Sequence, residues 1–171
     1  MLIIMAGLPA SGKSTLAYAL ADRLAGVVLN KDEIRAALFA STDIENCATQ
    51  DDFCMEIMLQ TATYLFGKNP SRYIFLDGRT FSRRYQIDRA IEAAEAFAQP
   101  SRIIECVVSD EDARKRLAAQ AKRNQHPAAN RDFSLYLEVK TRFEEIVAPK
   151  SVIDTAQPLE ICLKLALTAF D

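Results

Sequence analysis

Near its start the sequence reads Gly7-Leu8-Pro9-Ala10-Ser11-Gly12-Lys13-Ser14-Thr15, which fits the pattern G-x-x-x-x-G-K-[ST] at every defined position. The apolar run 2–6 precedes it with the pattern of a buried strand, and leucines and alanines at helical spacing follow it. The two glycines permit backbone angles that turn several N–H groups toward one point, and the next helix directs its free N–H groups there as well. The pattern therefore predicts a strand, a phosphate-binding loop and a helix in direct succession.

Along the rest of the chain, short apolar runs of strand length alternate with helical patterns. This alternation predicts an α/β fold in which helices cover both faces of a parallel sheet. In such sheets ligands bind beyond the carboxyl ends of the strands. We expect one domain, residues 1–171. The expected strands are 2–6, 27–29, 73–76, 102–108 and 152–153, and the expected helices are 13–25, 31–39, 51–66, 85–98, 110–122, 134–147 and 159–169.

Composition argues against several classes of protein. The net charge of −2 is not that of a protein that coats nucleic acid, and the apolar runs are far shorter than the roughly 20 residues of a membrane span. The first residues lack the basic leader of a signal peptide. The four cysteines form no C-x-x-C pair and there is one histidine, so no zinc site is expected. Free thiols are typical of a reducing compartment, so we expect a cytoplasmic protein with neither a membrane nor a protein partner.

Two charged residues follow the second expected strand. Asp32 and Arg35 are three positions apart at the start of a helix, so they share one face. The carboxylate can accept or orient the proton of a hydroxyl group, and the guanidinium can hold a phosphate or carboxylate. The alternative is an acidic helix start beside a solvated arginine. These residues alone leave both interpretations open.

The phosphate loop, followed after a short strand by Asn30-Lys31-Asp32-x-x-Arg35, resembles the P-loop kinases grouped with polynucleotide 5′-hydroxyl kinase and the zeta toxins. That group carries an AAA-type ATP-binding kinase domain. The resemblance implies a P-loop NTPase three-layer sandwich with a five-stranded parallel sheet and a helical lid. It also implies ATP and Mg²⁺ as cofactors, and a phosphotransferase with an alcohol group as acceptor. Asp32 would then be the general base, and Arg35 would contact the acceptor and a phosphate.

The expected nucleotide site centres on the loop, where Lys13 reaches the β- and γ-phosphates and Ser14 binds magnesium. By the same resemblance Asp77, at the end of the third strand, lies beside the metal, although it could instead be a turn residue before Gly78. Arg79 and Thr80 would face the acceptor. The expected nucleotide-binding residues are Gly7, Ala10, Ser11, Gly12, Lys13, Ser14 and Thr15.

A basic segment, residues 113–131, is the expected lid. Arg116 resembles the arginine that such kinases close over the phosphates, and Arg123 is a second candidate. Gln120 stands where related kinases often carry another arginine. The alternative for this segment is a solvated basic helix.

The acceptor is not named by any motif. The expected helix 51–66 and the turn before it would form one wall of the acceptor site, and an acidic wall repels a phosphate backbone. We therefore expect a small-molecule acceptor rather than a nucleic-acid 5′ end, with a polynucleotide 5′-hydroxyl kinase as the alternative. An ATPase or nucleotide switch without an acceptor is a second alternative. The acidic residues of the wall are Asp43, Glu45, Asp51, Asp52 and Glu56.

Overall fold

The computed structural model describes residues 1–123 and 132–170, and for Arg123 it describes the backbone alone. One parallel sheet has the strand order β2-β3-β1-β4-β5. The strands are β1 (Leu2–Ala6), β2 (Val27–Asn30), β3 (Ile74–Asp77), β4 (Ser101–Val107) and β5 (Ser151–Asp154). The helices are α1 (Lys13–Arg23), α2 (Lys31–Leu38), α3 (Ala48–Lys68), α4 (Arg84–Ala96), α5 (Asp110–Arg123), α6 (Phe133–Thr141) and α7 (Leu159–Leu167), with 3₁₀ turns at Ser41–Asp43 and Thr168–Phe170.

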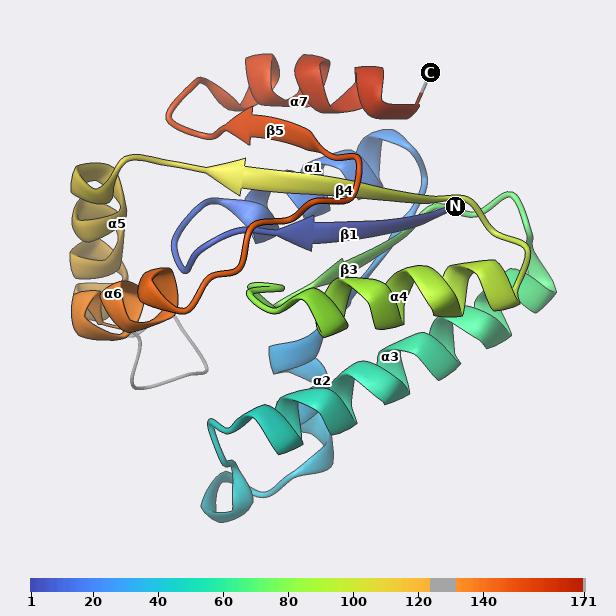
Figure 1. Ribbon diagram of the computed structural model, residues 1–171, viewed down its shortest axis with the longest axis horizontal. Helices are drawn as coiled ribbons and strands as arrows, with labels where there is room; N and C mark the ends of the chain where they lie inside the picture. Colours follow the sequence, from blue (N-terminus) through green and yellow to red (C-terminus); the bar gives the residue numbers. More distant parts are fainter. Residues whose placement is uncertain (124–131, 171) are drawn as a thin grey trace.

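Helices cover both faces of the sheet, as the sequence predicts (Figure 1). Alternate residues of β1 point to opposite faces. Leu2 and Ile4 join a core cluster with residues of α3 and α4, whereas Ile3 and Met5 join a second cluster with residues of α1 and α7. The expected α/β sandwich with a five-stranded parallel sheet is therefore confirmed.

The helices α5 and α6 lie beyond the carboxyl ends of the strands rather than on a face of the sheet (Figure 1). A third cluster, which contains Leu117 and Tyr136, packs these helices against Ala10 of the phosphate loop. Asp132 caps α6 by accepting a hydrogen bond from the Leu135 amide at 2.8 Å. Side chains from α5 thereby come to the same edge of the sheet as the loop.

Two helix ends differ from the expected ones. The helix expected over 51–66 begins earlier, at Ala48, and continues to Lys68, with Asn69 as its C-cap. The helix expected over 134–147 ends at Thr141, because the chain must return to the opposite end of the sheet to begin β5. On that return Ile146 is buried in the α3 and α4 core cluster.

No helix of residues 1–123 and 132–170 is both long and apolar enough to cross a membrane. All four cysteines are free thiols, three of them buried.

Candidate active site

The loop between β1 and α1 has the backbone of a phosphate cradle. Gly7 and Gly12 have φ angles of 132° and 82°, which favour glycine, and Ala10 also has a positive φ of 60°. The ammonium group of Lys13 donates hydrogen bonds to the carbonyl oxygens of Gly7 and Leu8 at 2.9 and 2.8 Å. Ser14 is exposed at the first turn of α1. A helix N-terminus, an ammonium group and a hydroxyl thus lie together at the carboxyl end of β1, as an anionic ligand requires.

Gly7 cannot carry a side chain. A Cβ atom there would lie 2.2 Å from the carbonyl oxygen of Cys106 on the neighbouring β4, and that backbone cannot move aside. We expect Gly7→Ala to lower the free energy of unfolding by about 2–4 kcal/mol. Gly67 is the matched control, since a Cβ there meets no atom within 4 Å and alanine favours a helix. Gly67→Ala should be neutral or stabilising by up to about 1 kcal/mol. Urea denaturation of both variants checks the pair, and equal midpoints would contradict this account of the loop.

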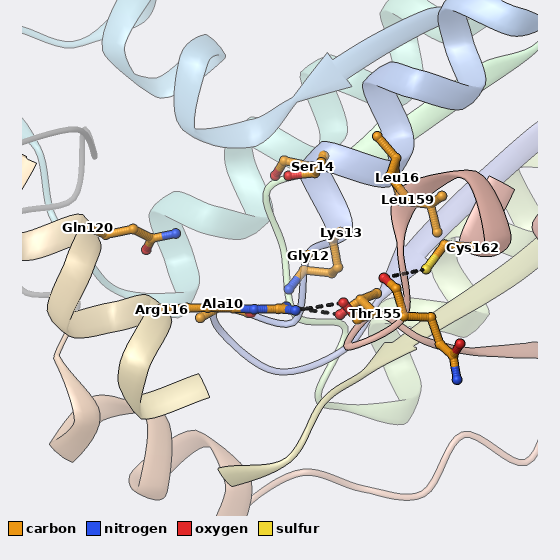
Figure 2. Close-up of a pocket in the computed structure, with 12 residues that line it drawn as sticks. Ala10, Gly12, Lys13, Ser14, Leu16, Arg116, Gln120, Thr155, Leu159 and Cys162 are labelled. Carbon is orange, nitrogen blue, oxygen red and sulfur yellow. Dashed lines mark hydrogen bonds between the residues drawn. The ribbon is translucent and has the colours of Figure 1, made fainter. Parts of the chain in front are cut away.

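A cavity of about 310 Å³ opens beside the loop (Figure 2). Its other walls come from α5, from the turn after β5 and from α7. Its volume is within the usual range for small-molecule sites. The residues lining it are Ala10, Gly12, Lys13, Ser14, Thr15, Leu16, Arg116, Gln120, Thr155, Gln157, Leu159 and Cys162.

Arg116 closes one side of this cavity by joining two loops (Figure 2). One guanidinium nitrogen donates to the carbonyl oxygen of Ala10 at 3.2 Å and to the Thr155 hydroxyl at 3.0 Å, and the other donates to the Thr155 carbonyl oxygen at 2.6 Å. In this structure Arg116 therefore ties the phosphate loop to the turn after β5. The other lid candidate, Arg123, has no described side chain, and residues 124–131 of the expected lid lie outside the described residues.

Substitution of Arg116 separates its two possible roles. If it shapes the nucleotide cavity, Arg116→Ala should raise the KM for ATP by about tenfold and change kcat by less than about threefold. Arg114→Ala is the matched control, because Arg114 lies on the same helix over the Phe133 ring and does not line the cavity. Steady-state kinetics at varied ATP concentration measure both constants. A fall in kcat of about 10²-fold or more with little change in KM would instead support the arginine over the phosphates.

Asp77 lies at the carboxyl end of β3 and is completely buried. Its Oδ2 accepts a hydrogen bond from the Asn30 side chain at 2.8 Å, while its Oδ1 has no hydrogen-bond partner within the described part of the chain. A buried carboxylate oxygen without a donor costs free energy unless a ligand or water satisfies it. Metal-bound water would satisfy it, so Asp77 and the exposed Ser14 hydroxyl fit a magnesium site. Among residues 1–123 and 132–170, no three His, Cys, Asp or Glu side chains are grouped so that they could hold a metal ion.

Asp32 and Arg35 lie in the first two turns of α2, which Asn30 caps by accepting hydrogen bonds from the amides of Asp32 and Glu33. Both line a second cavity, of about 130 Å³, between α2, the loop at Pro9 and residues of α6. Thr80 lines it as well. The structure therefore brings the predicted acceptor residues Asp32, Arg35 and Thr80 together beside the phosphate loop.

Arg79 lies elsewhere, in a groove between α3 and α4. Its guanidinium is buried and contacts Asp52 at 2.6 Å. Arg79, which was expected to face the acceptor, thus does not line the cavity that contains Asp32, Arg35 and Thr80.

Three acidic residues of the predicted wall are ion-paired with residues from other elements. Asp51 contacts Lys31 and Arg35, and Asp52 contacts Arg79. Glu56 accepts two hydrogen bonds from the guanidinium of Arg89, both at 2.7 Å. The wall is therefore less negative than the sequence of α3 by itself indicates, and it repels a phosphate backbone less strongly than expected.

The family and the fold can now be placed. A family described as AAA domain matches residues 2–145. The chain belongs to this AAA-domain family. No curated protein sequence matches the chain.

Several solved structures share the fold of this AAA-domain chain. One is a protein of Chloroflexus aurantiacus that has been assigned as a kinase. It has a TM-score of 0.77 and 21% identity, over 99% of this chain and 98% of that one. A sugar kinase of Janibacter sp. HTCC2649 has a TM-score of 0.71 and 18% identity, over 99% and 94%. The APS kinase of Mycobacterium tuberculosis, in complex with AMPPNP and APS, has a TM-score of 0.73 and 15% identity, over 99% and 96%. The resemblance to P-loop kinases is confirmed for the fold.

Sequence reasoning missed one part of the site of this AAA-domain chain. Thr155 accepts hydrogen bonds from Arg116, and its own hydroxyl donates to the Ser11 carbonyl oxygen at 2.8 Å, so it joins α5 to the phosphate loop. The signal was present, because Thr155 directly follows the last strand and the residues after each strand meet at the ligand-binding edge.

Proposed function

We propose that the protein is an ATP-dependent kinase that uses Mg²⁺ to transfer the γ-phosphoryl group of ATP to a hydroxyl group of a small molecule. The observation that carries the proposal is that residues of one phosphate loop line both the cavity of Lys13 and Ser14 and the cavity of Asp32. The cavity of about 310 Å³ contains Lys13 and Ser14, and the cavity of about 130 Å³ contains Asp32 and reaches the loop at Pro9. An enzyme that only hydrolyses ATP has no need of the second cavity. The name of the sugar kinase among the structural neighbours also supports a small hydroxyl compound.

Each polar group has a place in this reaction. Lys13 exchanges the carbonyl oxygens of Gly7 and Leu8 for phosphate oxygens and stabilises charge that develops on the transferred group. Magnesium, held through Ser14 and beside Asp77, would supply further neutralisation of the phosphates. The acceptor oxygen forms a bond to the γ-phosphorus as the bond to the ADP oxygen breaks, and Asp32 takes the hydroxyl proton.

Acceptor-dependent ATP consumption tests the proposal. Purified protein with Mg-ATP should consume ATP slowly alone, and at least about tenfold faster when a pooled extract of small metabolites is added. Glu33→Gln is the control for Asp32→Asn, since Glu33 is an exposed neighbour of Asp32 that accepts a hydrogen bond from Tyr18. Its ATP consumption should be stimulated as in wild type. Fast ATP consumption that no acceptor stimulates would assign the chain to the ATPase or switch class.

A further inference from the structure

The floor of the acceptor cavity is a closed group of two cations and two carboxylates. Lys31 contacts Asp32 at 3.2 Å and Asp51 at 2.8 Å. Arg35 contacts Asp32 at 3.6 Å and is also bonded to Asp51. A terminal nitrogen of the Arg35 guanidinium also donates a hydrogen bond to the side-chain oxygen of Asn46 at 3.2 Å. All four charged residues line the same cavity, so its floor is electrically balanced by the chain itself.

The two cations of this group are buried, so an excess of either sign would cost free energy. Lys31 and Arg35 are only 7% and 4% exposed, and burial lowers the pKa of Lys31 to about 8, against the opposing effect of Asp32. Buried charges are tolerated when they are paired, and any surplus of one sign is costly. The third cation in the cavity lining, Arg142, contacts Glu138 of its own helix at 3.0 Å. Among the described residues of the lining, each cation therefore already has a carboxylate partner.

Asp51 comes from a different element than the other three charges. It lies in the first turn of α3, whereas Lys31, Asp32 and Arg35 belong to α2, which packs against α3. Its carboxylate thus occupies the place on Lys31 and Arg35 where the phosphate or carboxylate of an acceptor would otherwise bind. An anionic acceptor must displace Asp51 or add a second negative charge to the balanced floor.

We propose that Asp51 determines acceptor specificity: the acceptor is uncharged where it meets the floor of the cavity, and hydroxyl compounds that carry a phosphate next to the reacting group are excluded. This inference rests on the proposed kinase function and names its substrate class. A nucleic-acid 5′ end would be excluded as well, because its first nucleotide carries a phosphate, whereas an uncharged small molecule would be accepted.

Matched pairs of acceptors test the exclusion. Each pair differs by one phosphate: glycerol and glycerol 3-phosphate, glucose and glucose 6-phosphate, adenosine and adenosine 3′-phosphate. For every pair that accepts label from γ-labelled ATP, wild-type kcat/KM should be at least about tenfold higher for the uncharged member. Asp51→Asn should reduce that ratio about tenfold or reverse it, and Asp51→Glu should retain it. A wild-type enzyme that favours the phosphorylated members would overturn the proposal.

A binding measurement decides the question even if no compound in the panel is the acceptor. Protein saturated with magnesium and AMPPNP, which fills the nucleotide site, is titrated with inorganic phosphate while its Tm is followed. We expect phosphate to raise the Tm of Asp51→Asn saturably, and to leave wild type and Asp52→Asn unchanged. Asp52 is the matched control because it is the next residue of α3 and contacts Arg79 outside this cavity. Saturable stabilisation of the wild type, or none of Asp51→Asn, would overturn the proposal. Failure of AMPPNP itself to stabilise the wild type would instead contradict the proposed function.

Discussion

Lys13→Ala should lower kcat/KM for ATP by about 10³-fold or more. Lys13 as a whole is 5% exposed, and its ammonium group lies against the carbonyl oxygens of the phosphate loop, where it can meet developing phosphoryl charge. In a site that excludes water such a charge acts far more strongly than at the surface. Initial rates and the Tm shift produced by Mg-ATP measure the loss of turnover and of binding.

Lys115→Ala is the control for this substitution. Lys115 is an exposed lysine on α5 that pairs with Glu111, so its removal should leave the kinetics unchanged. Circular dichroism should show the Lys13→Ala protein folded, because the positive φ angles of Gly7 and Gly12 set the turn of the loop. Turnover by Lys13→Ala within about tenfold of wild type would contradict the assignment of the loop as the phosphate site.

Asp32→Asn should lower kcat by about 10²–10⁴-fold while it leaves the affinity for ATP within about twofold of wild type. Asparagine preserves the shape of the side chain and removes its ability to take the acceptor proton. Asp32 lines the acceptor cavity and not the nucleotide cavity, so binding and chemistry should separate. Label transfer measures kcat, and titration with AMPPNP measures affinity. Full transfer by Asp32→Asn would show that another group accepts the proton or that none is needed.

The phosphate loop and the sheet were predictable from the sequence because both are local patterns. The residue types at fixed positions in 7–15 predict the loop, and short apolar runs predict the strands. The ligand-binding edge followed from the rule for parallel sheets, and in the structure Asp32, Asp77 and Thr80 lie at the carboxyl ends of the strands.

The pairing of charges between helices was not predictable. No spacing links Asp51 on α3 to Lys31 and Arg35 on α2, and the same holds for Asp52 and Arg79. Such contacts depend on how two helices pack against each other. No regular spacing in a single sequence reveals that packing. The acidic wall therefore looked unbalanced when its cations were supplied by other elements of the fold.

The end of α6 was missed for a related reason. Residues 142–147 have a helical pattern, yet the Glu144 amide donates to the Ser82 carbonyl oxygen at 2.9 Å and Ile146 packs into the sheet core. These tertiary contacts, and the need to return to the start of β5, override local helix propensity (Figure 1).

The destination of the γ-phosphoryl group tests the central claim most directly. One reaction would contain the protein, γ-labelled Mg-ATP, a 5′-hydroxyl oligonucleotide and a pooled small-molecule extract, with Asp32→Asn in a parallel tube. We predict label in a small hydroxyl compound, none on the oligonucleotide, and at least about 10²-fold slower labelling of the small compound in the parallel tube. Label on the oligonucleotide, or label found only as inorganic phosphate, would contradict the account.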